Sequence, residues 1–376
     1  MTSSSDSLTV PVDLGPRSYD IAIVSGELSS VAKSIETWAT KTTDTPSRTA
    51  LIISDANVSD RYAAPVADSL TQVGWTVETA VLKAGEQSKC QQVVSELYDR
   101  LVAMQADRRT IVIAVGGGVV GDISGFVAAS YARGIPFVQV PTTLLAQVDS
   151  SVGGKVGINH PRGKNLIGAF HQPLGVFIDT ATLESLPERD YRSGMAEVVK
   201  YGVILDEEFF TYLQAHQDGV NNRDADVLRH VVARCCQLKA DVVEQDEYER
   251  TGVRAVLNYG HTFAHAFETL SGYGELMHGE AVGIGMIYAS RLAERHGLID
   301  ASVTERQVAL FATLGIPTAL PESINLSTND ILDRMKLDKK AIAGRLRFVL
   351  PTKIGHVALY DDVPVEDVRA VLDVLG

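Results

Sequence analysis

The chain has 376 residues, of which 45% are hydrophobic and 22% are charged, and its 34 lysines and arginines against 47 aspartates and glutamates leave a formal net charge of −13. This composition is typical of a folded globular protein and excludes a disordered chain, a collagen and a coiled coil. The excess of acidic residues and the absence of a long basic run argue against nucleic acid as a partner.

The start of the chain and the cysteines indicate the compartment. No basic segment followed by an apolar one opens the sequence, and no 18 apolar residues occur in a row, so we predict no membrane partner. The cysteines are Cys90, Cys235 and Cys236. Because their number is odd and two are adjacent, we expect reduced thiols in a cytoplasmic protein.

Short β-rich runs alternate with helical stretches in the first half of the chain. The runs cover residues 19–24, 49–54, 75–82, 110–115, 137–140 and 176–178. This alternation predicts a mostly parallel sheet covered by helices, with ligands bound beyond the carboxyl ends of the strands. Asp55, Gly116 and Thr142 each follow one of these runs.

The pattern changes at about residue 180, where helical periodicity replaces the β-rich runs. The helical patterns cover residues 190–205, 224–244, 260–270 and 279–296. Two short apolar runs, 347–350 and 355–359, predict a small hairpin. We therefore predict an α/β fold with a Rossmann-like, mostly parallel-sheet domain of residues 1–180 and a mostly α-helical domain of residues 181–376.

A glycine-rich turn follows the fourth β-rich run. Residues 116–121 read Gly-Gly-Gly-Val-Val-Gly and match G-x-G-x-x-G. Glycine lets a backbone approach a pyrophosphate closely, and a helix N-terminus attracts its charge. The usual fingerprint follows the first strand, with an acid about 20 residues later, whereas here Asp122 follows at once and Asp55 is the acid at an earlier strand end. A dinucleotide site and a plain tight turn both remain open.

Three histidines lie within 18 residues of one another in a chain that has nine. His261 and His265 are four residues apart and so share a helix face, and His278 starts a later helix. Three carboxylates could complete a metal site: Glu197, Glu268 and Glu280. Histidines with one carboxylate are typical of a catalytic Zn²⁺ or Co²⁺ site, while an ordinary packed histidine pair is the alternative.

Cations are concentrated between residues 133 and 164. They lie among glycines and small residues, where backbone N–H groups are also exposed, so a phosphate or carboxylate ligand and a solvated charged face both remain open. Lys200, Arg254 and Asn258 are spaced so that they could face the same pocket as the histidines.

Six segments in this order resemble the 3-dehydroquinate synthase family, a branch of the sugar-phosphate cyclases. They are GGGVVGD at 116–122, PTTLLAQVDSSVGGK at 141–155, GKN at 163–165, GMAEVVK at 194–200, NYGHT at 258–262 and HGE at 278–280. Ala264 stands where the family usually has glycine, and Val156 replaces a common threonine. Neither departure removes a functional group.

The resemblance implies a two-domain lyase with its active site in the cleft between the domains. Its reaction would convert 3-deoxy-D-arabino-heptulosonate 7-phosphate, a phosphorylated sugar acid, to 3-dehydroquinate and phosphate in the shikimate pathway. The implied steps are transient oxidation by NAD, β-elimination of phosphate, reduction, ring opening and an intramolecular aldol reaction. The implied cofactors are NAD and Zn²⁺, with Co²⁺ as an alternative, and the implied assembly is a homodimer.

The resemblance also assigns roles residue by residue. The implied metal ligands are Glu197, His261 and His278, which differ from the His261 and His265 pair that spacing alone favours. The implied catalytic and substrate-binding residues are Arg133, Asp149, Lys155, Asn165, Lys200, Lys239, Arg254, Asn258, His265 and Lys340. The implied cofactor contacts are Asp55, Asn57, Glu86, Lys89, Gly117, Gly118, Asp122, Thr142, Thr143 and Lys164.

Three alternatives remain open. A sister cyclase would act on sedoheptulose 7-phosphate, which lacks the carboxylate that Arg254 and Asn258 are expected to bind. A metal-dependent polyol dehydrogenase would produce NADH and would not require the cationic run. A regulatory protein of the same fold would bind NAD and zinc without releasing phosphate.

Overall fold

The computed structural model describes residues 7–40, 47–272, 274–337 and 346–375. The chain divides into a sheet unit, formed by Met1–Leu186 and Leu228–Tyr248, and a helical unit, formed by Pro187–Val227 and Glu249–Gly376. The sequence predicts one boundary near residue 180, whereas the structure changes units after Leu186 and returns one later segment to the sheet unit. A single domain boundary cannot describe a chain that returns to its first unit.

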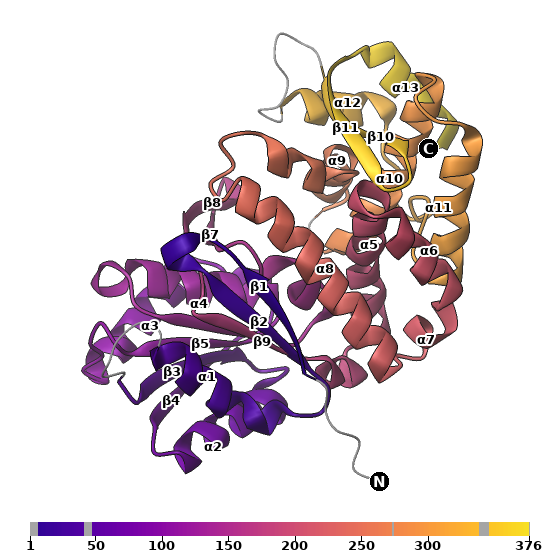
Figure 1. The fold of residues 1–376 in the computed structure, drawn as a ribbon. Helices are drawn as coiled ribbons and strands as arrows, with labels where there is room; N and C mark the ends of the chain where they lie inside the picture. Colours follow the sequence, from indigo (N-terminus) through magenta and orange to yellow (C-terminus); the bar gives the residue numbers. More distant parts are fainter. Residues whose placement is uncertain (1–6, 41–46, 273, 338–345, 376) are drawn as a thin grey trace. The chain divides into compact units, whose positions relative to one another are not determined.

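The sheet unit is built on seven strands (Figure 1). In spatial order they are β1 (Leu8–Val12), β2 (Tyr19–Val24), β9 (Gly175–Asp179), β6 (Phe137–Pro141), β5 (Ile111–Gly116), β3 (Thr49–Asp55) and β4 (Thr76–Leu82). All neighbours are parallel except β1 and β2. The six predicted strands are confirmed, and β1 is an additional edge strand that the sequence analysis does not find.

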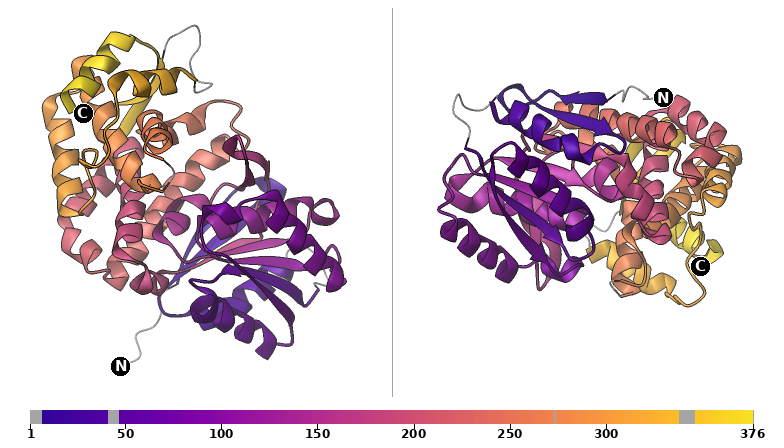
Figure 2. Two further views of the ribbon diagram at one scale, coloured as in Figure 1. Left: turned by 180° about the vertical axis from the view of Figure 1, so that it is seen from behind. Right: turned by 90° about the horizontal axis from the view of Figure 1, so that it is seen from below.

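Helices cover both faces of this sheet (Figure 2). On one face, Ile35 of α1 (Val31–Thr40) and Leu70 of α2 (Ala64–Gln72) pack in one core. On the other, α3 (Gln91–Ala103), α4 (Gly118–Ser130) and the hairpin of β7 (Lys155–His160) and β8 (Gly163–Phe170) enclose a second core. Strand β5 is buried along its whole length, as expected for a central parallel strand.

Helix α8 (Ala225–Gln245) belongs almost entirely to the sheet unit. The thiol of Cys236 donates to the Gln147 carbonyl oxygen at 3.3 Å, and the Asp13 N–H donates to Glu244 at 2.7 Å. Long-range contacts of this kind place a helix from the second half of the chain against the sheet.

The helical unit contains three of the four helices that the sequence predicts, and also the predicted hairpin. The fourth predicted helix is α8 of the sheet unit. The helices of the helical unit are α5 (Glu188–Leu205), α6 (Glu207–Ala215), α7 (Gln217–Asn221), α9 (His261–Leu270), α10 (His278–Arg295), α11 (Ala301–Thr313), α12 (Thr328–Leu337) and α13 (Val365–Leu375). The predicted helices, α8 included, are confirmed to within two residues. The hairpin is confirmed with longer strands, β10 (Leu346–Lys353) and β11 (His356–Val363).

Short turns of 3-10 or π geometry connect these elements. They are η1 (Gly15–Arg17), η2 (Leu28–Ser30), η3 (Ser59–Ala63), η4 (Glu86–Ser88), η5 (Tyr131–Arg133), η6 (Ala146–Ser150), η7 (Thr180–Ser185) and η8 (Val253–Asn258). Over the part of the chain that the structure describes, none of the helices has both the length and the apolar character needed to cross a bilayer.

Helix α10 passes unusually close to the start of α9. A Cβ at Gly285 would overlap with the carbonyl oxygen of Gly260, the residue just before α9. Glycine at 285 therefore allows the backbone of α10, at its third turn, to lie against the start of α9.

The cysteines provide a test of the packing of α8. Cys235 and Cys236 are buried, and burial raises the pKa of Cys236 to about 12, whereas Cys90 is partly exposed. In the folded protein, Cys90 should react with a thiol reagent first and the other two about a hundredfold more slowly, because a buried neutral thiol is inert. Kinetics of alkylation followed by mass spectrometry measure this, with Cys90→Ser as the variant that removes the fast phase. Simultaneous reaction of all three thiols without denaturant would contradict the packing.

Candidate functional site

A buried carboxylate and two histidines meet in the helical unit. One ligand atom each from Glu197, His261 and His278 lies within 4.8 Å of the others. The Nε2 atoms of His261 and His278 are each 3.8 Å from Oε1 of Glu197. Glu197 lies on α5, and the two histidines are the first residues of α9 and α10. Three helices thus each contribute one potential metal ligand.

The environment of Glu197 suits a cation. Its side chain is 1% exposed, and neither of its oxygens accepts a hydrogen bond from the described residues. Lys200, one turn later on α5, forms an ion pair with Oε2. Because a buried carboxylate without hydrogen bonds is costly, this arrangement is typical of a group that binds a positively charged ligand.

Contacts at Nδ1 leave the other nitrogen of each histidine available for a metal. Nδ1 of His261 lies 3.1 Å from the Tyr259 carbonyl oxygen. Since a carbonyl only accepts, Nδ1 carries the proton and Nε2 keeps its lone pair. Nδ1 of His278 faces Oε1 of Glu268 at 3.6 Å.

The two imidazoles differ in their electrostatics. Burial, followed by the charge of Lys200, lowers the pKa of His261 well below its usual value, so the ring is neutral. Burial also acts to lower the pKa of His278, but the carboxylates of Glu268 and Glu197 outweigh it and the pKa is raised. A neutral imidazole is the form that binds metals.

The start of α10 is held by contacts with α5. A Cβ at Gly279 would overlap with the Ser193 carbonyl oxygen, and the Gly279 N–H donates to Ser193 Oγ at 3.0 Å. The Glu280 carboxylate accepts from Nε of Arg189 at 2.7 Å and from the Met277 N–H at 2.9 Å. Glu280, a candidate ligand in the sequence analysis, is therefore engaged in positioning the helix that carries His278.

His265 lies one turn beyond His261. The centroids of their rings are 5.6 Å apart and the rings are perpendicular. Spacing alone favours these two as a ligand pair, but the cluster formed by the described residues contains His278 and Glu197 instead. Residue spacing within α9 cannot reveal the ligands Glu197 and His278, because they lie on two other helices, α5 and α10.

Polar side chains of the sheet unit gather around the glycine turn. Nζ of Lys89, which is 4% exposed, donates to Asp122 Oδ2 at 2.6 Å and to Asn165 Oδ1 at 2.5 Å. Burial, partly offset by the Lys89 charge, raises the pKa of Asp122. The hydroxyl of Thr142, at the end of β6, is buried and has no partner among the described residues.

The turn itself offers backbone donors. Helix α4 begins at Gly118 without a side-chain cap, and the first N–H groups of a helix have no acceptor within the helix. A Cβ at Gly117 would lie 3.1 Å from Thr143 Cγ2, and one at Gly118 would lie 3.0 Å from Ser150 Oγ. Substitution of these glycines would therefore press against Thr143 and Ser150 at the helix N-terminus, a position where an anion binds favourably.

A second buried cation lies elsewhere in the sheet unit. Nζ of Lys239 on α8 donates to the carbonyl oxygen of Asp149 at 2.6 Å and to its Oδ1 at 2.8 Å. In the helical unit, the buried Arg254 of η8 has its Nε 3.7 Å from Glu249 Oε1. Buried cations of this kind are suited to anionic substrates.

Each unit holds its own part of the predicted set. The sheet unit contains Asp55, Asn57, Glu86, Lys89, Gly117, Gly118, Asp122, Arg133, Thr142, Thr143, Asp149, Lys155, Lys164, Asn165 and Lys239. The helical unit contains Glu197, Lys200, Arg254, Asn258, His261, His265 and His278. Lys340 lies outside the described residues.

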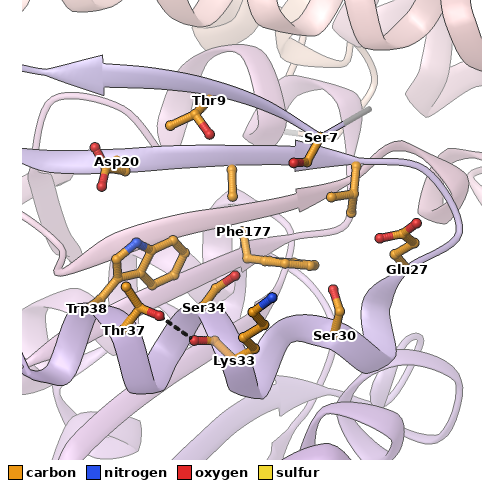
Figure 3. A pocket seen from close by; sticks show the side chains of 12 residues that line it. Ser7, Thr9, Asp20, Glu27, Ser30, Lys33, Ser34, Thr37, Trp38 and Phe177 are labelled. Atoms are coloured by element: carbon orange, nitrogen blue, oxygen red, sulfur yellow. Dashed lines mark hydrogen bonds between the residues drawn. The ribbon is translucent and has the colours of Figure 1, made fainter. Parts of the chain in front are cut away.

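A cavity of about 380 Å³ also occurs in the sheet unit, beside β1, β2 and α1 (Figure 3). Its walls include the hydroxyls of Ser30, Ser34 and Thr37 and the ring of Trp38. None of the predicted site residues lines it.

Comparison with known proteins identifies the family. A model of the 3-dehydroquinate synthase N-terminal region matches residues 79–193, and a model of the C-terminal region matches residues 194–341. Over 365 residues the chain is 50% identical to the 3-dehydroquinate synthase of Desulforamulus reducens, an alignment that covers 97% of this chain and 99% of the relative. The chain belongs to the 3-dehydroquinate synthase family.

Two solved structures share the fold of this family member. A 2-deoxy-scyllo-inosose synthase complexed with carbaglucose-6-phosphate, NAD⁺ and Co²⁺ is 29% identical, with a TM-score of 0.85 and coverage of 97% of this chain and 99% of the other. The 2-epi-5-epi-valiolone synthase of Streptomyces hygroscopicus, with NAD⁺ and Zn²⁺ bound, is 28% identical, with a TM-score of 0.84 and coverage of 95% and 96%.

The structure adds supporting contacts that the sequence analysis does not predict. Asn159 donates to Glu86 at 2.7 Å and accepts from the Asn165 N–H at 2.8 Å. The Tyr259 carbonyl supports His261, and Glu268 faces His278. A backbone carbonyl leaves no signal in a side-chain pattern, whereas Asn159 is near the motifs and could have been considered. Glu268 is a candidate metal ligand in the sequence analysis, but the structure places it beside His278 and outside the cluster.

Removal of one ligand should weaken metal binding. His278→Ala leaves two of three protein donors, so the affinity for Zn²⁺ should fall by about a hundredfold or more. Competition with a chromophoric chelator measures the affinity. His296→Ala is the matched control because His296 follows the same helix and pairs with Asp367, 3.3 Å away. Wild-type affinity in His278→Ala would remove His278 from the ligand set.

Proposed function

We propose that the chain is a carbon-oxygen lyase that converts 3-deoxy-D-arabino-heptulosonate 7-phosphate to 3-dehydroquinate and phosphate. Its 50% identity to a 3-dehydroquinate synthase over nearly the whole chain is the observation that carries this reaction. The cluster of Glu197, His261 and His278 supports it, because the chemistry requires a polarised alcohol.

The donor set fits a divalent cation such as Zn²⁺ or Co²⁺. Glu197 is buried and accepts no hydrogen bond from the residues that the structure describes, and two imidazole Nε2 atoms face it. Three nitrogen and oxygen donors leave coordination positions for a substrate, as in catalytic zinc sites. We assign the metal to Glu197, His261 and His278.

The sheet unit fits a dinucleotide. The uncapped N-terminus of α4 suits a pyrophosphate, and the unpartnered hydroxyl of Thr142 and the Lys89–Asp122 pair suit polar groups of the cofactor. NAD would be held by Asp55, Asn57, Glu86, Lys89, Gly117, Gly118, Asp122, Thr142, Thr143 and Lys164. Bound together, the cation would acidify a substrate alcohol and NAD would accept and return a hydride.

The cations of the chain bind and orient the substrate. Lys200, Lys239 and Arg254 are all buried, and a buried cation binds phosphate or carboxylate more strongly than an exposed one. The planar guanidinium of Arg254 matches a carboxylate, and Asn258 precedes the His261 turn and offers an amide to the same group. Asp149 accepts from Lys239 and so fixes the position of its Nζ.

The remaining groups complete the substrate contacts. His265, on the same face of α9 as His261, would present a ring nitrogen to a substrate hydroxyl. Arg133, Lys155, Asn165 and Lys340 are assigned to the substrate by the family motifs. A cytoplasmic location and a homodimeric assembly stay predictions.

Phosphate release distinguishes this function from its alternatives. With NAD⁺ and Zn²⁺ present, the heptulosonate should release phosphate, form 3-dehydroquinate and show no net NADH, and EDTA should abolish the reaction because it removes the metal. A phosphate assay with product identification measures this, with sedoheptulose 7-phosphate as the parallel substrate. Release from the sedoheptulose phosphate alone would indicate a sister cyclase. Accumulation of stoichiometric NADH would indicate a dehydrogenase. Binding of NAD⁺ and zinc without turnover would indicate a regulatory protein.

Loss of the buried lysine should weaken cofactor binding. In Lys89→Met, Asp122 and Asn165 lose their common donor, so the dissociation constant for NAD⁺ should rise by about tenfold or more. Isothermal titration calorimetry measures it. Lys83→Met is the matched control because Lys83 is exposed and precedes the same turn. Equal affinity in the two variants would remove Lys89 from the cofactor site.

A further inference from the structure

The two histidines of the cluster are supported in different ways. His261 is buried, and its Nδ1 is held by a backbone carbonyl 3.1 Å away. The side chain of His278 is 36% exposed, and its Nδ1 is not within hydrogen-bonding distance of any carbonyl that the described residues provide. A partly exposed ring at the first residue of a helix needs another group to select its orientation, because rotation about χ2 would exchange its nitrogen and carbon positions.

Glu268 is placed to provide that selection. It lies on α9, seven residues after His261, with its side chain 13% exposed. Its Oε1 is 3.6 Å from Nδ1 of His278, while the opposite nitrogen, Nε2, is 3.8 Å from Oε1 of Glu197. The imidazole therefore lies between two carboxylates, with one ring nitrogen toward each.

The chemistry of the two carboxylates assigns the nitrogens. An ionised carboxylate only accepts, so the Glu268 side favours a proton on Nδ1 and leaves the lone pair of Nε2 for a cation beside Glu197. Helix α9 would then support both histidine ligands, since its first residue is one of them and its last turn orients the other. The start of α10 is already fixed by Ser193 and Arg189, so the ring rotation of His278 is the freedom that remains.

We propose that Glu268 is a positioning residue that orients His278 and sets its tautomer for binding a divalent metal. The inference rests on the proposed metal site, but it concerns a residue outside the ligand set and outside the substrate and cofactor contacts.

Two substitutions separate orientation from charge. Glu268→Leu removes the acceptor and keeps a similar volume, and Glu268→Gln keeps an oxygen acceptor without the charge. Zn²⁺ affinity, measured by chelator competition on the isolated protein, should fall by about 10–100-fold in Glu268→Leu and by less in Glu268→Gln. Glu275→Leu, at an exposed position of the preceding loop, is the matched control and should bind as the wild type does.

A second readout follows the ring itself. Nitrogen-15 NMR of the ring of His278 at saturating Zn²⁺ should show Nδ1 protonated and Nε2 bound to the metal in the wild type, and a mixture of the two ring orientations in Glu268→Leu, a change that a general loss of stability would not produce. Circular dichroism confirms that each variant is folded. If Glu268→Leu does not fold, Glu268→Gln and its ring shifts decide the question.

The outcomes separate this inference from the proposed function. Zn²⁺ affinity in Glu268→Leu within about twofold of the wild type, or an unchanged ring orientation, would overturn the role of Glu268 even in an active enzyme. Failure of the wild type to release phosphate would overturn the proposed reaction and leave the metal measurement valid.

Discussion

The rest of the helical unit depends on one buried charge, the carboxylate of Glu197. An ionised carboxylate that is almost inaccessible to solvent and accepts no hydrogen bond from the described residues is costly to bury, and Lys200 is its ion-pair partner. A cation held jointly with two imidazoles would lower that cost. The helices that converge on Glu197 can therefore be understood as a support for charge as well as a hydrophobic core.

Backbone proximity gives this support its geometry. Gly279 allows α10 to begin against Ser193 of α5, and Gly285 allows the same helix to pass against Gly260 at the start of α9. Larger residues at these two positions would separate the helices that carry the ligands. Because a displacement of one ångström changes coordination and hydrogen bonding, the small residues contribute to chemistry without touching a ligand.

The sheet unit uses the same principle with the opposite charge. Lys89 is buried between Asp122 and Asn165, so the ammonium and the carboxylate compensate one another and hold the glycine turn and the β8 strand together. The N-terminus of α4, on the same helix as Asp122, has no side-chain cap. In both units a desolvated ionic group therefore lies near groups that can bind a charged ligand, which is how proteins strengthen such binding.

The local sequence determined the six parallel strands of the main sheet, the β10–β11 hairpin, four of the helices and many of their chemical groups. Periodicity predicts these elements because burial on one or two faces imposes a repeat in the sequence. It missed β1, an edge strand of five residues with little of that repeat, and the β7–β8 hairpin. The family motifs indicated Glu197, His261 and His278 as a set, whereas spacing within one helix joined His261 to His265. Only the tertiary structure decided that three helices bring the ligands together, that Glu280 binds Arg189, that Glu268 faces His278, and that α8 packs with the sheet. These relations link residues up to 231 positions apart, and no local pattern encodes them because they arise from packing between elements rather than from the repeat within any one of them.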